Sequence, residues 1–446
     1  MPPRHPLWEL SFDVPQLHST EKLRLISMAQ SICRQTVGNA MKMQEAPIKT
    51  SVKNRRTQRI ARICQGRDTV DPSLEGMCAF TQVSSTIEEI ADFFHLNSPD
   101  KVETFVAVTG QRLLDHRKIY TLLERNTPPR STGGQTVNPL HYIGIDWMAT
   151  KSPLFFADRD MCYIECHDEF EFYDTASDVK RRGFVRAMNS INLKCVPSLK
   201  HSLNITRSHI YRSGYVFFET DDPDTLDFFC VIVQKPDGLR HPNLLAMQRH
   251  CARSLNVEEY LQARRMNAYL HRGIFESVVN YQCKDATASC MRCQKKFGFF
   301  FSKKHCRICG LVVCSSCSKR WDLELRNSIK ALVRVCKTCF DGGSFSNNHN
   351  PSTSQVFNMK TPFAVSPTMT RRRTEPLKST SDEQDLDELS DLTLIEGHRA
   401  QFRQGIFSFR SNAMSILYSS KESSFSPYPD SMDDVSMACH PRNGSF

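Results

Sequence analysis

Four pairs of cysteines near positions 290 to 340 of this 446-residue sequence have the spacing of metal ligands. Each pair reads Cys-x-x-Cys, and twelve, four and eighteen residues separate successive pairs. Two intervening residues allow a tight turn that brings both thiolates to about 2.3 Å from one tetrahedral Zn²⁺. Each pair is therefore a chelating hook, and two hooks complete one site. The predicted ligands are Cys290, Cys293, Cys306, Cys309, Cys314, Cys317, Cys336 and Cys339.

The short gap between the second and third pairs predicts how the hooks combine. With only four residues between them, these two hooks are awkward partners for one ion, so an interleaved arrangement is favoured. It assigns Cys290, Cys293, Cys314 and Cys317 to one zinc, and Cys306, Cys309, Cys336 and Cys339 to the other. Sulfur fills all four positions of each ion, so we expect two structural zinc ions, which contribute to folding and not to catalysis.

The rest of the chain favours metal ligands over disulfides. Eighteen cysteines are present, but the start MPPRHPLWEL lacks the apolar segment of a secretion signal. No stretch approaches the roughly 20 apolar residues of a membrane span. We therefore expect a cytoplasmic, reducing environment, in which clustered cysteines bind metal. The sequence also lacks GxSxG, P-loop and HExxH patterns, so we expect no enzyme.

Positive charge is concentrated around the cysteines. The formal net charge of the chain is +10, and residues 281–341 hold thirteen Lys or Arg against four Asp or Glu, a balance of +9. A basic segment of this kind predicts an anionic partner, unless the charges only form a solvated surface. Nothing else in the chain resembles a base-reading helix or a stacking sheet, so we expect no nucleic acid.

Residues 303–310, KKHCRICG, and 334–336, RVC, resemble a FYVE zinc finger, a family that binds phosphatidylinositol 3-phosphate on endosomal membranes. Its basic motif, R-R/K-H-H-C-R-x-C-G, aligns with residues 302–310. The resemblance implies phosphate contacts from Lys303, His305, Arg307 and Arg334. Arginine offers a planar fork to phosphate oxygens, and a protonated histidine adds a charge that is lost as pH rises.

The sequence departs from this family at several positions. The W-x-x-D motif aligns with residues 281–284, where Tyr281 stands in place of the tryptophan and Lys284 in place of the aspartate. Ser302 replaces the first arginine of the basic motif, and Lys304 replaces its first histidine. These changes weaken the expectation of strict 3-phosphate selectivity, but they leave a basic surface suited to anionic lipid.

An apolar run, FGFFF at residues 297–301, lies between pairs of lysines. Phe297 is expected to pack inside the finger. Phe299 and Phe300 fall where the FYVE family has its membrane-inserting loop, so the resemblance implies that these two rings enter the bilayer interface. The alternative is that all four rings fill a core, although a small finger stapled by metal has little core to fill.

Two kinds of helix signal precede the finger. Leu25, Met28, Ala29 and Ile32 form an apolar stripe behind an N-cap at Ser19 or Thr20. A capping box at residues 85–88 starts a second helix, and an amphipathic helix is expected at 243–260. The basic stretch 53–67 is interpreted as the exposed face of a strand or helix rather than a binding patch.

Period-two patterns between these helices predict an antiparallel sheet, because no long helices separate the strands. The predicted strands are Tyr142–Trp147, Met161–Phe172, Gly183–Ile191, Gly214–Thr220 and Leu226–Val233. The stretches HYIGIDWMATKSP, RDMCYIEC, RRGFVRAMNSI and YRSGYVFFETD are similar to START-like domains. That resemblance implies a helix-grip fold with a lipid or sterol ligand between the sheet and the C-terminal helix.

The sequence thus predicts a multidomain α+β protein. Its parts are an N-terminal helix and basic segment (1–75), a START-like domain (76–270), a two-zinc cross-brace finger (281–343) and a disordered tail (344–446), the last from its Ser, Asn, Pro and Thr content. We expect a lipid-binding protein, peripheral on endosomal membranes, whose finger docks on phosphoinositides. The alternatives are a zinc-finger adaptor for other proteins and a RING-like ubiquitin ligase.

Overall fold

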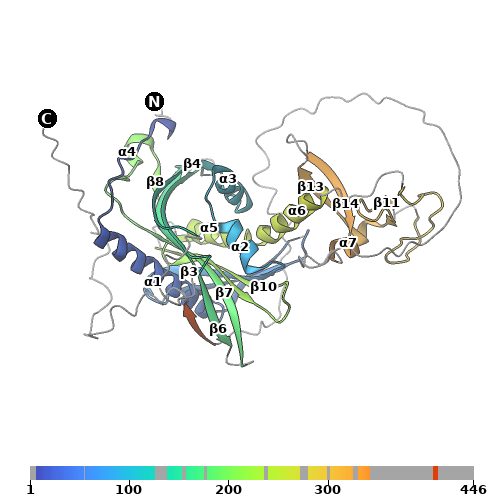
Figure 1. Ribbon diagram of the computed structural model, residues 1–446, viewed down its shortest axis with the longest axis horizontal. Helices are drawn as coiled ribbons and strands as arrows, with labels where there is room; N and C mark the ends of the chain where they lie inside the picture. Colours follow the sequence, from blue (N-terminus) through green and yellow to red (C-terminus); the bar gives the residue numbers. More distant parts are fainter. Residues whose placement is uncertain are drawn as a thin grey trace, which may run out of the picture. The chain divides into compact units, whose positions relative to one another are not determined.

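The computed structural model describes residues 7–54, 56–125, 138–152, 157–174, 178–235, 240–271, 280–298, 302–324, 330–341 and 405–409. The chain divides into two compact units. The first comprises Met1–Arg264 together with Leu392–Phe446, and the second comprises Arg265–Asp391 (Figure 1). The second unit contains the cysteine finger. Among the described residues, no helix is both long enough and apolar enough to span a membrane.

An eleven-stranded sheet forms the centre of the first unit. Its main path runs β1-β2-β3-β10-β9-β7-β6-β5-β4, and each neighbouring pair on this path is antiparallel, while β8 and β15 each add to β6. The strands are β1 Ile48–Lys53, β2 Ile60–Arg67, β3 Glu75–Val83, β4 Leu113–Leu123, β5 Tyr142–Thr150, β6 Arg159–Asp174, β7 Val179–Ser190, β8 Thr206–Arg207, β9 Ser213–Glu219, β10 Leu226–Gln234 and β15 Gly405–Phe409. The antiparallel sheet and its five predicted strands, now β5, β6, β7, β9 and β10, are confirmed.

Helices cover both faces of this sheet, so most strands are apolar on both sides. Alternate residues of β6 and β9 enter two separate cores, for example Phe218 in one and Phe217 in the other. Helix α1, Ser19–Met43, packs on the first face through Leu25, Ala29 and Ile32 (Figure 1). The second face is covered by α2 Ile87–Phe94, α3 Pro99–Val108, α5 Arg240–Ala252 and α6 Leu255–His271. Short elements complete the unit: η1 Leu7–Glu9 and α4 Lys200–Leu203. The predicted grip of a helix on a curved antiparallel sheet is confirmed.

Two helix boundaries differ from the prediction. Helix α1 is capped by His18, whose side chain accepts a hydrogen bond from the backbone N–H of Thr20, so Ser19 and Thr20 already lie inside the helix. The single helix predicted at 243–260 is wrong, because α5 ends at Ala252 and α6 begins at Leu255. The N–H of Ser254 bonds to the carbonyl of Cys251, three residues back, and this tighter turn interrupts the α-helical ladder. The capping box before α2 is present, with Thr86 as N-cap.

The segment predicted as a separate N-terminal part, 1–75, supplies α1, β1 and β2 to the first unit. The basic stretch 53–67 includes β2, which buries Ala61, Ile63 and Cys64 and leaves Arg62 and Arg67 at least partly exposed. Arg62 and Arg67 therefore lie on the exposed side of a strand, which agrees with the interpretation of this stretch as an exposed strand or helix face. The boundaries at 75 and 270 stay predictions.

Two glycines provide a matched test of this packing. A Cβ on Gly214 in β9 would lie 2.0 Å from the backbone oxygen of Arg186, whereas a Cβ on Gly38 in α1 would have no atom nearer than 4.0 Å. We expect Gly214→Ala to lower the free energy of unfolding by about 3 kcal/mol, since a backbone atom cannot move aside. Gly38→Ala should raise it by up to about 1 kcal/mol, through helix propensity. Urea unfolding of both variants checks this, and equal stabilities would contradict it.

The finger is built from two short hairpins and one helix. Strand β11 (Lys304–His305) pairs with β12 (Val312–Val313), and β13 (Ser318–Glu324) pairs with β14 (Lys330–Cys336). A 3-10 turn, η3 Ser315–Cys317, precedes β13, and α7 Lys337–Asp341 follows β14. Among the few buried apolar side chains described here are Val312, Val313, Trp321 and Val335. The Trp321 ring stacks on Phe340 at a centroid distance of 5.1 Å. So small a core cannot hold the fold without further restraint.

A strand interrupts the segment predicted as a disordered tail. Residues Gly405–Phe409 form β15, which pairs with β6 in the first unit. The prediction of an unstructured tail is therefore wrong at these five residues. The rest of 344–446, including the basic run at 371–373 and Thr374, lies outside the described residues.

Candidate metal centre and headgroup site

The eight sulfur atoms form two groups of four, with the members of each group within 4.8 Å of one another. The groups are the interleaved sets predicted from the gaps: Cys290, Cys293, Cys314, Cys317 and Cys306, Cys309, Cys336, Cys339. Tetrahedral Zn²⁺ with bonds of about 2.3 Å requires sulfurs about 3.8 Å apart. The Sγ atoms of Cys293 and Cys314 are 3.7 Å apart, and those of Cys309 and Cys336 are 4.0 Å apart. The finger thus has two structural zinc sites.

Backbone N–H groups help to hold these sulfurs as thiolates. The N–H of Cys314 points to Cys290 Sγ at 3.3 Å, and the N–H of Cys336 points to Cys306 Sγ at 3.3 Å. Burial raises the pKa of the Cys290 thiol, but the backbone N–H groups around it outweigh burial and lower that pKa to about 6. In the folded finger these N–H groups therefore favour the thiolate form, which is the form that binds a cation.

Arg292 links the two zinc sites and was missed by sequence reasoning. It lies between Cys290 and Cys293 of the first site, yet its Nη2 points to Cys309 Sγ at 3.6 Å and to Cys339 Sγ at 3.9 Å in the second. Four thiolates around one Zn²⁺ carry a net negative charge, which a guanidinium offsets. A cation inside a Cys-x-x-Cys pair is the sequence signal that could have identified this role.

Three of the four predicted headgroup contacts meet at one segment, residues 281–284. Lys303 Nζ donates to the carbonyl of Lys284 at 2.8 Å. His305 Nε2 lies 2.7 Å from the carbonyl oxygen of Gln282, and since a carbonyl only accepts, Nε2 carries the proton. Arg307 Nη1 donates to the Tyr281 hydroxyl at 2.6 Å. The structure therefore places Lys303, His305 and Arg307 against the segment aligned with the W-x-x-D motif.

Tyr281 fills the position expected for tryptophan and contacts two side chains of the basic motif. Its ring centroid lies 4.8 Å from that of His305 and 5.4 Å from Arg307 Cζ. An aromatic face at these distances orients a guanidinium and an imidazole without neutralising them. The substitution of tyrosine for tryptophan therefore preserves an aromatic support for the basic motif.

Arg334 is placed differently from the other three. Its backbone carbonyl accepts from the N–H of Arg307 at 2.8 Å, but its guanidinium donates to Ser318, to the Oγ at 2.9 Å. Burial, with the charge of Arg320, lowers the pKa of Arg334. Phe299 and Phe300 lie outside the described residues, while Phe297 is half-buried.

A second candidate site is a cluster of buried polar groups in the first unit. Arg186 on β7 donates from Nε and Nη2 to Glu165 Oε2 on β6, at 2.9 and 2.7 Å, and both side chains are almost completely buried. The guanidinium carbon lies 4.6 Å from the Phe105 ring and 5.6 Å from the Phe94 ring, so it faces α2 and α3. Arg186 Nη1 and His167 Nδ1 have no hydrogen-bond partner within the described part of the chain, while His167 Nε2 lies 3.8 Å from Glu165 Oε1. Such groups could bind the polar end of a ligand held in the grip.

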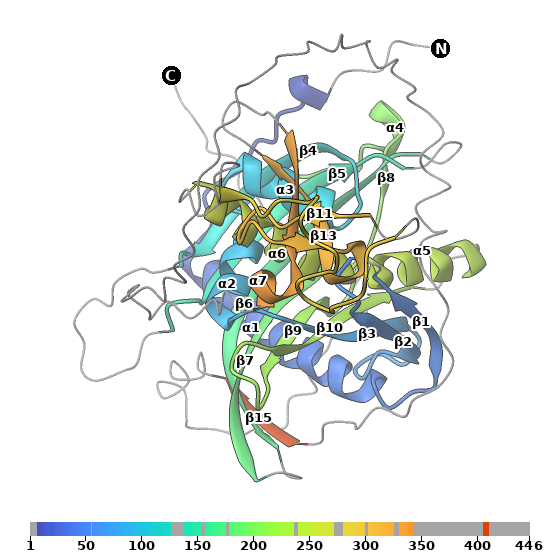
Figure 2. The ribbon, with the colours of Figure 1, turned by 90° about the vertical axis from the view of Figure 1, so that its right-hand side faces the viewer.

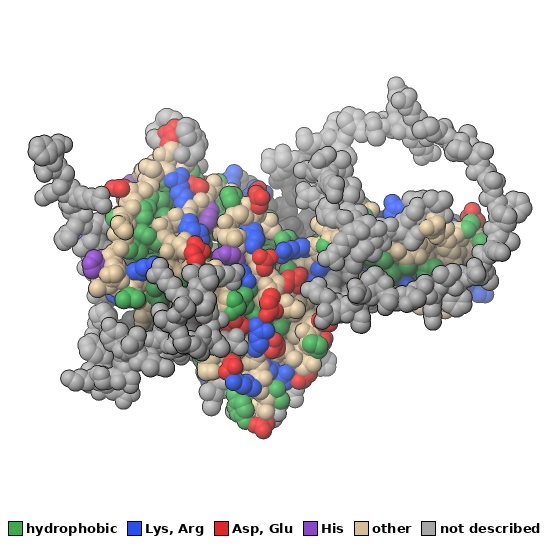
Figure 3. Space-filling view, viewed as in Figure 1, with side chains coloured by type: hydrophobic (Ala, Val, Ile, Leu, Met, Phe, Trp, Pro, Cys, Tyr) green, Lys and Arg blue, Asp and Glu red, His purple; other side chains and the backbone are tan. Residues whose placement is uncertain are grey.

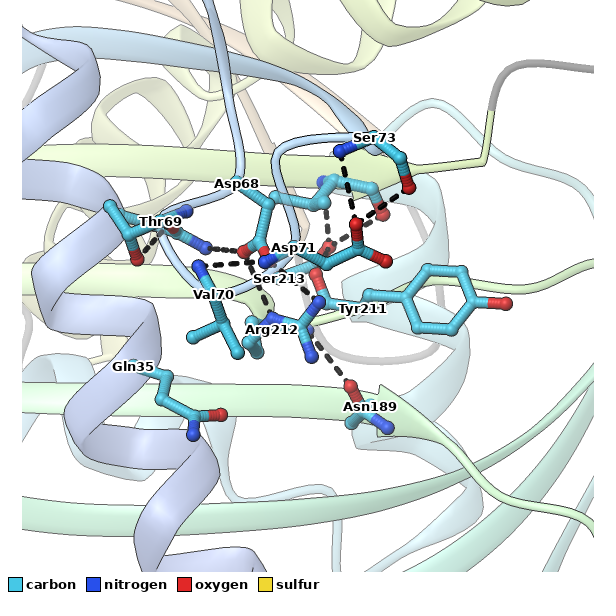
Figure 4. A network of polar contacts seen from close by, with 12 residues as sticks. Gln35, Asp68, Thr69, Val70, Asp71, Ser73, Asn189, Tyr211, Arg212 and Ser213 are labelled. Atoms are coloured by element: carbon cyan, nitrogen blue, oxygen red, sulfur yellow. Dashed lines mark hydrogen bonds and ion pairs between the residues drawn. The ribbon is translucent and has the colours of Figure 1, made fainter. Parts of the chain in front are cut away.

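A second buried ion pair has a different character. Arg212 Nη2 lies 2.6 Å from Asp68 Oδ2, and Asp68 also accepts from Asn39 and from the N–H groups of Val70 and Asp71 (Figure 4). The backbone N–H of Arg212 in turn donates to Asn189 Oδ1 at 3.0 Å. This network ties the loop before β3 to α1 and β7, so we interpret it as a structural clamp.

Charges of both signs are mixed on the first unit. On the face seen in Figure 3, its Lys and Arg side chains alternate with Asp and Glu. Ion pairs on this unit, such as Lys101 with Asp92 and Arg182 with Glu88, fit that mixture. The excess of positive charge noted in the sequence belongs instead to residues 281–341.

Comparison with known proteins identifies the second unit's finger. The FYVE zinc finger family model matches residues 280–344, so this segment is a FYVE-type zinc finger. Among curated relatives, 1-phosphatidylinositol 3-phosphate 5-kinase FAB1 of Saccharomyces cerevisiae is 38% identical over 81 residues, which are 17% of this chain and 4% of that protein. Pleckstrin homology domain-containing family F member 2 of Gallus gallus is 49% identical over 53 residues, 12% of this chain and 21% of its own length. The chain thus spans only a small part of these relatives.

The chain is also similar to a solved structure. Human StAR-related lipid transfer protein 5 aligns with 52% of this chain and 96% of its own, at 10% identity and a TM-score of 0.34. The fold described above comes from the strands and helices themselves and does not depend on this match.

Proposed function

We propose that this protein is a peripheral membrane protein whose FYVE-type finger binds the headgroup of a phosphoinositide on endosomal membranes. One observation carries the proposal: the side chains of Lys303, His305 and Arg307 meet at residues 281–284. Cys306 lies between His305 and Arg307, and together with Cys309 it belongs to the second zinc site. Bound zinc would therefore hold the basic motif in place. The name of the FAB1 relative includes phosphatidylinositol 3-phosphate, which supports a lipid of this class.

The chemistry of the three contacts suits a phosphate. Their present partners are two carbonyl oxygens and a phenol, which are neutral and leave the positive charges of Lys303 and Arg307 uncompensated. Phosphate oxygens would form charge-assisted hydrogen bonds with the same donors, and these are about twice as strong as neutral ones. Arg334 would act through its backbone bond to Arg307, since its guanidinium is engaged by Ser318.

Selectivity is expected to be broader than for a finger with an intact W-x-x-D motif. Lys284 stands where an acid is expected and is exposed beside the Lys303 contact. Another cation at this edge favours anionic headgroups in general over one phosphate position. We further propose that Phe299 and Phe300 insert into the interface, as the family's loop would.

Lys303→Ala combined with Arg307→Ala is expected to weaken vesicle binding at least about tenfold, because two charge-assisted contacts are lost. Flotation with phosphatidylcholine vesicles containing phosphatidylinositol 3-phosphate measures this. The matched control is Arg320→Ala with Lys337→Ala, which removes the same charge from two exposed positions of the finger.

Native mass spectrometry should find two zinc ions in parent, variant and control. If the two double variants lose vesicle binding equally, the finger binds through its diffuse positive charge, and the proposed headgroup site is rejected. Unchanged flotation of both variants would reject the headgroup site. A parent that does not float would favour the adaptor or ubiquitin-ligase alternatives, and an autoubiquitination assay would separate those two.

A second proposed function is that the first unit binds a lipid or sterol inside its grip. The Nη1 of Arg186 and the Nδ1 of His167 support it, because both side chains are fully buried and neither atom has a hydrogen-bond partner among the described residues. Burial, followed by the charge of His167, lowers the pKa of nearby His95 to about 4, so a neutral polar headgroup suits this interior better than a cation. Native mass spectrometry of the purified protein tests the idea, and a mass equal to chain plus zinc alone, even after incubation with a lipid extract, would reject it. We propose no catalytic role for either unit.

A further inference from the structure

The second half of β6 has one edge that the main path of the sheet leaves open. Strand β5 pairs with β6 only as far as His167, opposite Tyr142, whereas β7 continues along β6 to Asp174. Beyond His167, therefore, β6 has a neighbour on the β7 side alone within the main path. Unpaired N–H and C=O groups at such an edge can accept another extended segment.

Strand β15 occupies this edge. It runs antiparallel to β6 through five residue pairs, from Gly405 opposite Asp174 to Phe409 opposite Phe170 (Figure 2). Because β7 already lies along the other side of the same residues, β15 must take the side that β5 leaves free. The segment thus binds by strand addition, in which the main chain provides affinity and alternate side chains provide specificity.

The side chains of β15 point alternately inward and outward. Phe409 is 6% exposed, and its ring lies 5.3 Å from that of Phe170, which also contacts Phe218 at 5.2 Å. Phe170 lies across Gly183, where a Cβ would come within 2.3 Å of the ring. Phe407 joins the same aromatic group at 6.5 Å from Phe170. A Phe-x-Phe pattern therefore fits this edge.

The residue between the two phenylalanines is exposed and faces an acid. Ser408 lies directly opposite Glu171 in the antiparallel register, with Glu169 and Tyr173 diagonal to it. Glu171 pairs with Lys180 and Glu169 with Arg182, so the cations of β7 are already engaged. Like charges directly opposite each other on two strands are destabilising. A negative charge at position 408 would therefore oppose docking of β15.

We propose that the free edge of β6 is a strand-docking site, that Gly405–Phe409 of the same chain is its reversible occupant, and that phosphorylation of Ser408 releases it. A protein kinase would transfer the γ-phosphoryl group of ATP to Ser408 Oγ, forming an O–P bond, with ADP as leaving group and the hydroxyl proton passing to a kinase base. Arg403 and Arg410 flank the serine and suit a kinase that prefers basic sequences. The added charge of nearly two then prevents the strand from docking again.

Hydrogen exchange of the full chain tests this, because the alternate amides of 405–409 that face β6 gain their protection from it. In the parent these amides should exchange far more slowly than in a free peptide. Ser408→Asp should reduce the protection about two- to fivefold, and Ser408→Lys, of similar size but opposite charge, should leave it equal or higher. Unchanged exchange in β10, Leu226–Gln234, verifies that each variant is folded.

A labelled peptide of residues 403–411 gives an independent measurement. It should bind Ser408→Asp more tightly than the parent, whose edge is occupied, and a peptide phosphorylated at Ser408 should bind neither. Free exchange at 405–409 in the parent, or equal protection in the Asp and Lys variants, would overturn the proposal. A parent that forms a dimer, with the Asp variant monomeric, would place the strand on a second copy and overturn the intramolecular assignment.

Discussion

Replacing Cys336 with serine is expected to unfold the finger while the first unit stays folded. Cys336 is fully buried, its thiolate accepts the N–H of Cys339 at 3.4 Å, and it is one of four ligands of the second zinc site. Zinc binding contributes about 10–16 kcal/mol to the folding of small fingers, which far exceeds what the few buried apolar residues here can supply. Native mass spectrometry should show a fall from two zinc ions to one or none, with loss of exchange protection across β13 and β14.

Cys283 provides the matched control for this change. It lies in the same finger, it is exposed, and it belongs to neither group of four sulfurs. Cys283→Ser should therefore keep both zinc ions and the full protection of β13 and β14. A Cys336→Ser variant that behaved like this control would show that the second group of sulfurs does not close a metal site.

Replacing Arg186 with methionine is expected to lower the free energy of unfolding of the first unit by about 3–5 kcal/mol, because it leaves the buried Glu165 carboxylate without its partner. Adding Glu165→Gln to this variant should recover a large part of the loss, since the uncompensated charge is removed. Chemical denaturation of the two single variants and the double variant gives the coupling between the two residues.

The matched control is Lys180→Met, which breaks a pair between the same two strands. Lys180 and Glu171 are 2.6 Å apart, but their side chains are 62% and 33% exposed, so the change should cost less than about 1 kcal/mol. If Arg186→Met lowers the free energy of unfolding no more than Lys180→Met does, burial does not determine how much this ion pair matters.

The same pair predicts an acid-sensitive stability. Burial alone would raise the pKa of Glu165, but the positive charge of Arg186 outweighs it and holds that pKa well below the ordinary 4.5. A carboxyl whose folded pKa is depressed stabilises the fold above its unfolded pKa, and that stability is lost as the pH falls below about 4.5 toward the folded value. In the double variant Arg186→Met with Glu165→Gln, the free energy of unfolding should therefore fall less steeply with pH in this acidic window than it does in the parent.

The zinc sites were predictable because ligand spacing alone constrains them. Two residues between thiolates make each pair a hook, and the four residues between the middle hooks disfavour their sharing one ion. The interleaved pairing was therefore favoured, and the structure groups the sulfurs that way. The strands from β5 to β10 were likewise visible as short apolar runs bounded by turns. In both cases the signal lies within a few residues of the feature.

Features that depend on contacts between distant segments were not predictable. The break at Ser254 has no glycine or proline to mark it. Strand β15 depends on a free edge more than two hundred positions earlier in the chain, and the partners Glu165 and Arg186 meet only after β6 and β7 pair. Arg292 looked like one more surface cation, because its sulfur partners belong to hooks farther along the sequence.

The burial of both sheet faces has a consequence for how the chain finds its fold. When one face of a strand is exposed to solvent, a register shift of one residue is unfavourable because it exposes apolar side chains. In β7 and β9 both faces are buried, so a register shift exposes few apolar side chains and this cost largely disappears. A one-residue slip of β7 would instead carry Arg186 away from Glu165 and toward the side chains beneath α1. The buried ion pair thereby favours one register of β7, because any other register would leave a buried charge without its partner.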